Sequence, residues 1–231
     1  MKSILFYLVD CILLSVDSIF TKISSFNLTK INPFNKSNNN LSPARNHLVL
    51  LQLDQIGDFI IFTDVLKLIR NMYPKNQWII TLVGFEDWRN LVEPFYNNPN
   101  EQLIDEFIPV NMKKMQNNYK YRFATLKKIT NIESDVLLNP NIARTPIMDE
   151  IVMLSKSKNK IGFTKNKDTI FSRYVDLFYT QLVVAKNPIP HEIMVYRDYF
   201  IKLGFNLDDT LSMRLKWYQE DIDKVKFLLK C

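Results

Sequence analysis

Short apolar runs that never alternate with polar residues constrain the fold of this chain more than any other feature. They lie at 47–53, 78–83, 107–110, 135–138 and 160–163. Segments with helical spacing of apolar residues lie between or after them, at 59–72, 86–96, 112–129 and 146–154. Continuous apolar runs are typical of strands buried on both faces. The alternation therefore predicts an α/β fold, with a parallel sheet flanked by helices.

The chain beyond Thr164 shows a weaker pattern. Residues 168–184 are rich in aromatic side chains and fit neither period, whereas 191–203 predict a helix that Gly204 closes, because glycine favours the left-handed conformation after a helix. Residues 219–230 start another helix with an apolar stripe suited to a partner. We expect one domain over 47–210 and the start of a connection over 211–231.

The first 46 residues predict two further segments. Residues 1–23 are apolar except on one helical face, where Ser3, Asp10 and Asp17 recur, so they form an amphipathic helix. The two acids exclude a membrane span or a secretory signal. In-plane binding to an anionic membrane and docking onto protein both remain open. The net charge of 5 − 2 = +3 over residues 1–47 favours the membrane, whereas the two acids on the polar face weaken binding to lipid. Residues 24–46, with seven asparagines, form a linker.

Composition excludes several classes of protein. The chain has four glycines, placed so that neither GxGxxG nor the phosphate-binding GxxxxGK[ST] loop can be written. Two cysteines and two histidines indicate neither a disulfide framework nor a metal site, and we expect no cofactor. A reducing compartment such as the cytoplasm fits this cysteine usage. The basic residues form no recognised nucleic-acid motif, so no nucleic-acid partner is expected.

The loop after the first apolar run is the first place to expect chemistry. Ligands of open α/β sheets bind beyond the carboxyl ends of the strands, where this chain has Gly57 and Asp58. Gly57 is expected to adopt a positive φ in a tight turn and to let a ligand approach the backbone. Asp58 would start the helix with its carboxylate directed at the ligand. The alternative is a plain helix N-cap without chemistry.

This region resembles the opening of glycosyltransferase family 9, the ADP-heptose:lipopolysaccharide heptosyltransferases. Residues 48–74 contain the hydrophobic strand, the polar-x-x-Gly57-Asp58 loop, the apolar helix and the Tyr73-Pro74 ending of that family. Residues 79–84, 160–162 and 191–204 match later family segments in order. The chain departs from the family at Gln52, where arginine or lysine is frequent.

The resemblance implies the N-terminal, acceptor-binding half of a GT-B enzyme, which consists of two Rossmann-like domains. The nucleotide-sugar donor, ADP-heptose, would bind a second domain that is missing here, so we expect a truncated product or a half-enzyme. Asp58 would be the catalytic base of an inverting, metal-independent transfer. Gly57, Asn139, Asn141 and Arg144 would contact the acceptor, a lipopolysaccharide core or related glycan. Arg144 suits a carboxylate or phosphate, unless it is a surface arginine at a helix start.

Two functions follow from the resemblance. The first is glycosyl transfer in the cytoplasm, at the inner face of the cytoplasmic membrane, with residues 1–23 as a peripheral contact. The second is a non-catalytic remnant or interaction module that keeps the acceptor-domain fold. A second α/β domain that binds a nucleotide would distinguish them.

Overall fold

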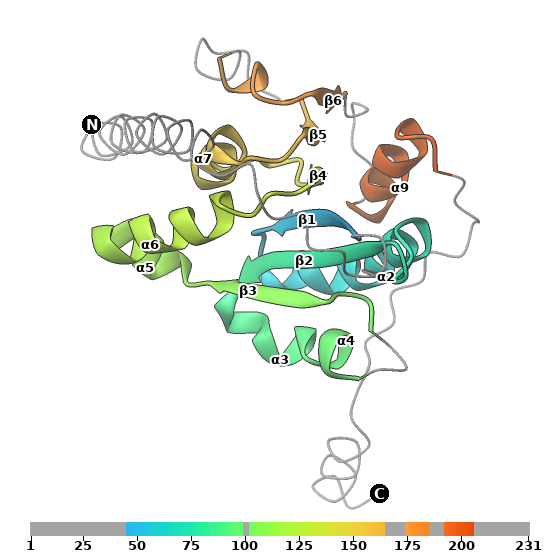
Figure 1. Cartoon of the computed structure of the whole chain (residues 1–231), viewed down its shortest axis with the longest axis horizontal. Helices are drawn as coiled ribbons and strands as arrows, with labels where there is room; N and C mark the ends of the chain where they lie inside the picture. Colours follow the sequence, from blue (N-terminus) through green and yellow to red (C-terminus); the bar gives the residue numbers. More distant parts are fainter. Residues whose placement is uncertain (1–44, 99–101, 165–173, 185–191, 206–231) are drawn as a thin grey trace, which may run out of the picture.

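The computed structural model describes residues 45–98, 102–164, 174–184 and 192–205 (Figure 1). Its centre is one sheet of six parallel strands in the order β3-β2-β1-β4-β5-β6. The strands are β1 (Asn46–Gln52), β2 (Trp78–Phe85), β3 (Glu106–Val110), β4 (Val136–Asn139), β5 (Asn159–Phe163) and β6 (Gln181–Val183). The predicted parallel α/β fold is confirmed, and it has the strand order of a Rossmann-like sheet.

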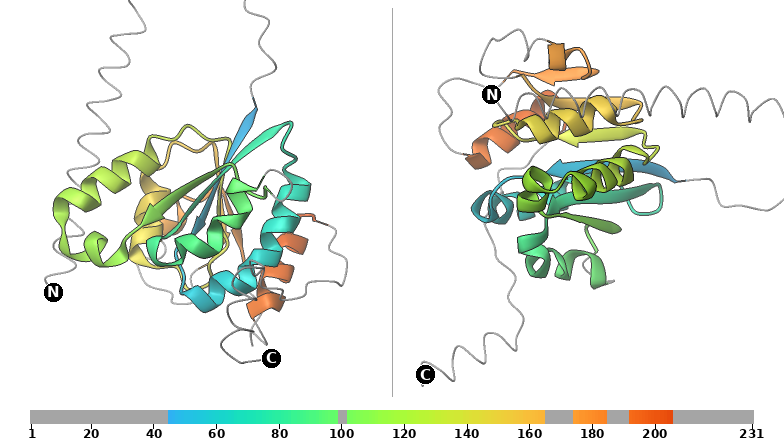
Figure 2. Two further views of the ribbon diagram at one scale, coloured as in Figure 1. Left: turned by 90° about the horizontal axis from the view of Figure 1, so that it is seen from below. Right: turned by 90° about the vertical axis from the view of Figure 1, so that its left-hand side faces the viewer.

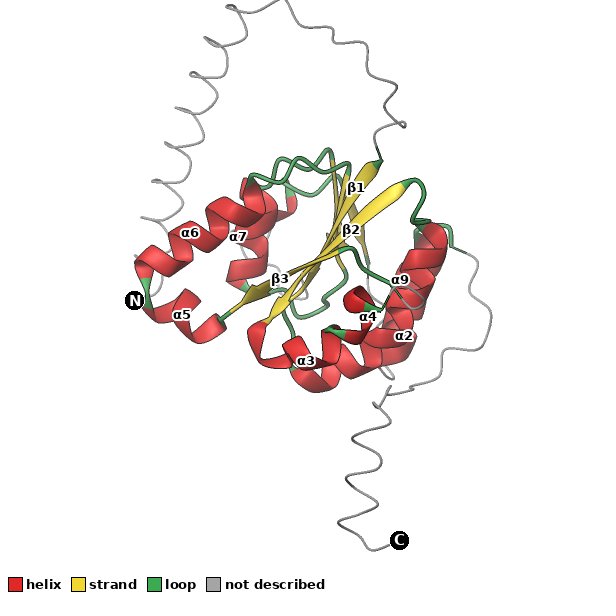
Figure 3. Cartoon of the chain, turned by 60° about the horizontal axis from the view of Figure 1, so that its bottom comes forward, coloured by secondary structure: helices red, strands yellow, loops and turns green. Residues whose placement is uncertain are grey.

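Helices cover both faces of the sheet, as Figures 2 and 3 show. One face carries α2 (Ile56–Met72), α3 (Arg89–Val92), α4 (Pro94–Asn97) and α9 (Glu192–Lys202). The other carries α5 (Met112–Asn117), α6 (Tyr119–Thr130) and α7 (Pro146–Leu154). Each layer has its own apolar core: side chains such as Leu48 and Leu50 of β1 face α2 and α9, while Val49 and Leu51 face α6 and α7. Both faces of β1 are therefore buried, which explains its unbroken apolar run.

Two of the expected helices are interrupted. In place of one helix over 86–96, the chain forms a 3-10 turn (Glu86–Trp88) and two short helices, and Pro94 begins the second of these. Proline has no N–H, so it begins a helix more readily than it continues one. In place of one helix over 112–129, α5 and α6 meet at Asn118, whose side chain accepts the N–H of Tyr121 at 3.0 Å and caps α6.

The segment beyond Thr164 contributes a strand that the sequence pattern did not predict. β6 is three residues long and pairs with β5 at the edge of the sheet. The predicted helix at 191–203 is confirmed as α9, and Gly204 follows it with φ of +88°. The amphipathic helix predicted at 1–23, all but the last two residues of the linker at 24–46 and the connection at 211–231 lie outside the described residues. None of the described helices is both long and apolar enough to cross a bilayer.

The strand order determines where a ligand would bind. From β1 the chain proceeds outward to β2 and β3, then returns to the other side of β1 with β4 and proceeds outward to β5 and β6. The reversal lies between β1 and β4, which pair in parallel. In open α/β sheets the crevice beyond the carboxyl ends of such a pair is the usual binding place. The segments that begin at Leu53 and Pro140 lie there.

Candidate functional site

A direct contact joins the two loops at this reversal. Asn141, two residues beyond the end of β4, donates its Nδ2 hydrogen to the main-chain oxygen of Leu51 in β1 at 2.8 Å. The same Nδ2 also donates to Asn139 Oδ1 at 2.7 Å. The loop after β4 is therefore held against the end of β1, and Asp58 lies on the first turn of the helix that follows β1.

Asp58 is the third residue of α2, not its N-cap. The N-cap is Gln55, and Asp58 Oδ2 accepts the main-chain N–H of Gln55 with an N–O distance of 3.1 Å. This is half of the arrangement known as a capping box. The carboxylate is half-buried, and its Oδ1 has no partner among the described residues. One oxygen is thus fixed by the backbone and the other is available to a ligand.

Gly57 differs from the expectation in its backbone conformation. It lies inside α2, and Gly204 is the only described glycine with a positive φ, so the predicted positive φ of Gly57 is wrong. The helix begins one residue before Gly57, and the turn therefore precedes it. Gly57 is exposed, and a Cβ added to it would meet no atom within 4 Å. The space beside it is open, which suits the close approach of a ligand.

Asn139 and Asn141 are brought together, but both are buried. Asn139 Nδ2 donates to the hydroxyl of Tyr179 at 2.9 Å, and Asn139 Oδ1 accepts from Asn141. Burial raises the pKa of the Tyr179 phenol well above its usual range, and Asp149 raises it further. The phenol is therefore neutral, and it donates to Asp149 Oδ1 at 3.2 Å. Asn141 Oδ1 is buried and has no partner in the described structure.

Arg144 is enclosed by protein groups, so its interpretation as a surface arginine is wrong. Its side chain is 0% exposed. Nε donates to Asp149 Oδ1 at 2.8 Å, Nη1 donates to Phe163 O at 2.6 Å and to Asp176 Oδ1 at 2.7 Å, and the guanidinium lies 4.4 Å from the ring centroid of Tyr179. Only Nη2 has no partner in the described structure. In this conformation the guanidinium cannot bind an anion with both of its outer nitrogens.

Gln52 is a polar residue of the site that sequence reasoning treated only as a departure from the family pattern. It ends β1 and is fully buried, and its Nε2 donates to the hydroxyl of Tyr196 in α9 at 3.1 Å. Its Oε1 has no partner in the part of the chain that the structure describes. The available signal was a glutamine inside an otherwise apolar strand, which requires a buried hydrogen-bond partner.

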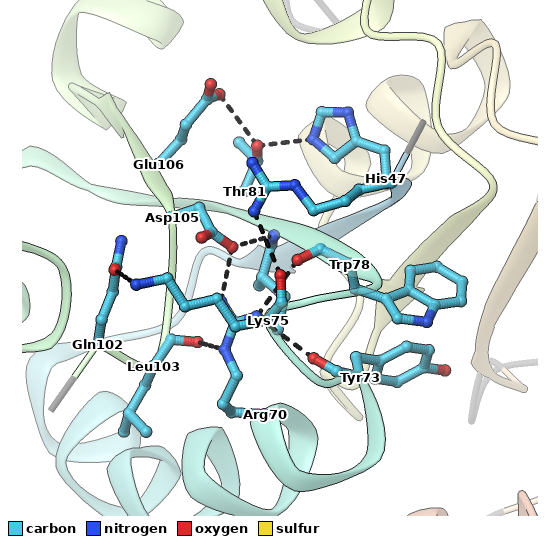
Figure 4. Close-up of polar contacts among 12 residues, drawn as sticks. His47, Arg70, Tyr73, Lys75, Trp78, Thr81, Gln102, Leu103, Asp105 and Glu106 are labelled. Atoms are coloured by element: carbon cyan, nitrogen blue, oxygen red, sulfur yellow. Dashed lines mark hydrogen bonds and ion pairs between the residues drawn. The ribbon is translucent and has the colours of Figure 1, made fainter. Parts of the chain in front are cut away.

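A second polar cluster lies at the opposite, amino-terminal end of the sheet (Figure 4). Arg70 pairs with Asp105 at 2.6 Å and donates to the main-chain oxygen of Leu103 at 2.9 Å. His47 Nε2 lies 2.8 Å from Thr81 Oγ1, which donates to Glu106 Oε2 at 3.1 Å. These bonds join β1, β2, β3 and α2, so the cluster stabilises the fold. Within the described residues, no three His, Cys, Asp or Glu side chains converge as a metal site requires.

No family model matches the sequence of this chain. No curated protein matches it either.

Solved structures do match. The glycosyl transferase family 9 structure from Veillonella parvula DSM 2008 superposes with a TM-score of 0.61 at 18% identity, covering 80% of this chain and 49% of that one. E. coli heptosyltransferase WaaC with ADP superposes with a TM-score of 0.56 at 15% identity, covering 71% and 49%. The chain spans about half the length of these structures. The expected resemblance is thus confirmed at the level of the fold: this chain has the Rossmann-like fold of glycosyltransferase family 9 structures over about half of their length.

Proposed function

We propose that this chain is the acceptor-binding half of an inverting, metal-independent glycosyltransferase of the heptosyltransferase type. The observation that carries the proposal is the place of Asp58. Its carboxylate is half-buried on the first turn of α2, beside the open space at Gly57 and at the reversal of a sheet shared with family 9 structures. A carboxylate with one bonded and one available oxygen suits a general base.

Asp58 would act on a hydroxyl group of the acceptor. The hydroxyl oxygen attacks the anomeric carbon of the donor sugar, while the bond from that carbon to the nucleoside diphosphate breaks and its electron pair leaves with the diphosphate. Asp58 Oδ1 accepts the hydroxyl proton. Attack opposite the leaving group inverts the anomeric centre. The bond from Gln55 N–H to Oδ2 keeps the carboxylate oriented during the transfer.

The loop after β4 would hold the acceptor. Asn141 donates to Leu51 O and to Asn139 Oδ1, so its first role is to fix this loop against β1. Asn141 Oδ1 and Arg144 Nη2 are buried side-chain atoms of this loop that have no partner among the described residues. We propose that Asn141 Oδ1 accepts a hydroxyl of the acceptor and that Arg144 Nη2 binds an acid group of a lipopolysaccharide core. Both contacts require the loop to open enough to admit the acceptor.

The same resemblance supports a sugar donor and a location in the cell. The proposed donor is a nucleotide sugar of the ADP-heptose type, bound by a second domain. WaaC, whose solved structure contains ADP, is consistent with this choice. The glycan acceptor would place the protein in the cytoplasm, at the inner face of the cytoplasmic membrane.

Two measurements test the proposal. Calorimetric titration of the full chain with a deacylated lipopolysaccharide-core oligosaccharide should show binding, which Asp58→Asn preserves. Turnover of ADP-heptose should appear when a donor-binding domain completes the protein, and Asp58→Asn should reduce it by about 10²–10⁴-fold. Binding without turnover in the completed protein would favour the non-catalytic module. Absence of acceptor binding would refute the proposal.

A further inference from the structure

One segment of the chain carries all of its net positive charge. Residues 107–132 contain five lysines and one arginine and no acidic residue. The whole chain has 30 basic and 24 acidic residues, so outside this segment 30 − 6 = 24 basic residues balance 24 acidic ones. The net charge of +6 therefore equals the charge of this one segment, which forms α5 and α6.

The fold directs these charges to the solvent. Arg122 points inward and pairs with the buried Glu150 at 2.6 Å. The five lysines are exposed, and we call them the lysine surface: Lys113, Lys114, Lys120, Lys127 and Lys128. Thr125, Leu126 and Ile129 on the opposite side of α6 are buried against the sheet. No ion pair joins Lys113, Lys114, Lys120 or Lys128 to any acid in the described part of the chain.

Aromatic side chains lie among these lysines. Tyr119 is 55% exposed, at the junction between α5 and α6, and Tyr121 and Phe123 are half-buried. Lys114 Nζ lies 5.7 Å from the ring centroid of Tyr121, and Lys127 Nζ lies 5.9 Å from that of Phe123. Tyrosine prefers the boundary between lipid and water, because its ring is apolar and its hydroxyl is not.

We propose that the lysine surface on α5 and α6 binds the surface of a membrane that contains anionic lipids. Each lysine near such a surface is attracted by about 1 kcal/mol, so the five together bind substantially without any apolar insertion. α5 begins directly after β3, and Asn111 at its start donates to Glu86 after β2 at 2.9 Å, so this surface starts at the carboxyl edge of the sheet. Binding would bring that edge toward the lipid, independently of any activity.

Lysine chemistry favours lipid over nucleic acid. Arginine is the preferred residue for bidentate contacts to phosphates and bases, and the single arginine of the segment is held by Glu150. Lysine provides a flexible point charge that suits a diffuse layer of anionic headgroups, and its methylene stem can lie against apolar surface. The exposed charges of this segment are all lysines.

Sedimentation of the full chain with vesicles tests the proposal. Vesicles of phosphatidylcholine and phosphatidylglycerol in equal parts should bind the protein at low salt, and vesicles of phosphatidylcholine alone should not. In the triple variant Lys114→Gln, Lys120→Gln and Lys128→Gln, the partition coefficient should fall on the order of 100-fold, or about fivefold per lysine. High salt should also lower the partition coefficient of the wild-type protein, because it screens the attraction between the lysines and the anionic lipids.

A matched triple variant removes the same charge elsewhere: Lys75→Gln, Lys156→Gln and Lys202→Gln, all at exposed positions. It should keep most of the binding. Thermal unfolding should show that both variants are folded.

Equal loss of vesicle binding in the two triple variants would overturn the proposal, because net charge alone would then account for binding. Undiminished binding of the first triple would also overturn it and would leave residues 1–23 as the membrane contact. Tighter binding to a DNA duplex than to the vesicles would overturn it in favour of nucleic acid.

Discussion

Asp58 accepts the main-chain N–H of Gln55 across the first turn of α2, with 3.1 Å between Gln55 N and Asp58 Oδ2. This bond gives the carboxylate a structural role and a chemical one together. It satisfies a donor at the helix start, and Oδ1 has no partner among the described residues. To separate the two roles, a substitution must keep an oxygen that accepts the N–H of Gln55 and remove the group that takes up a proton.

Asp58→Asn should retain the bond to Gln55, because the amide oxygen replaces Oδ2, and should lose the proton acceptor. The free energy of unfolding should change by less than about 1 kcal/mol, from the lost interaction between the charge and the helix dipole. Asp58→Ala should cost about 1 kcal/mol, because the N–H of Gln55 loses its partner. Urea denaturation measures both values. An Asn variant that transfers sugar as fast as the wild type in the completed protein would show that Asp58 is only a helix-start residue.

Gly57→Ala should stabilise the protein and weaken acceptor binding. Gly57 has a helical conformation and open space around it, so alanine gains roughly 0.5–1 kcal/mol of helix stability. The new methyl group would occupy the space that we assign to the ligand. Gly84→Ala is the control for the effect of open space on stability. Its new Cβ would lie 2.5 Å from Trp88 Cη2, so this variant should be destabilised. Unchanged acceptor affinity in a stabilised Gly57→Ala protein would remove Gly57 from the site.

The strands of the sheet were predictable because burial on both faces leaves a strong signal. β1 and β2 are continuous apolar runs, and their limits were predicted to within two residues. β6 has three residues in an aromatic segment and gains its order from pairing with β5, which no local pattern reveals. The break between α5 and α6 depends on the cap by Asn118, whereas the apolar spacing continues through it.

The place of the candidate site residues in the fold could be predicted, but their contacts could not. The motif identified Asp58 and its place beyond β1, because that place follows from chain order in a parallel sheet. The backbone of Gly57 was predicted wrongly, because the helix could begin at either end of the loop. The enclosure of Arg144 depends on Asp176 and Phe163, which are distant in sequence, so no local pattern indicates it.

His47 should make stability depend on pH near neutrality. Burial lowers its pKa from the ordinary value of 6.5, although Glu106, Asp135 and Asp105 favour the charged form. The unfolded chain therefore binds a proton at a higher pH than the folded one. The contribution is full above about pH 6.5, the ordinary value, and is lost as the pH falls through the lower pKa of the folded state. His47→Gln, which retains a donor for Thr81, should flatten this slope in urea denaturation between about pH 5 and pH 8. Equal slopes in the two proteins would exclude His47 as the cause.

Arg144→Met should destabilise the fold strongly, because it leaves Asp149 as a fully buried carboxylate without its cation. Breaking such a pair from one side costs about 3–5 kcal/mol, whereas the exposed pair of Arg89 and Glu86 should cost less than about 1 kcal/mol when Arg89→Met removes it. Adding Asp149→Asn to Arg144→Met should restore part of the loss, since it removes the buried negative charge that Arg144 balanced. Urea denaturation of these variants measures the difference. An Arg144→Met protein as stable as the Arg89→Met protein would mean that the contacts of the guanidinium to Asp149, Asp176 and Phe163 contribute little to the fold.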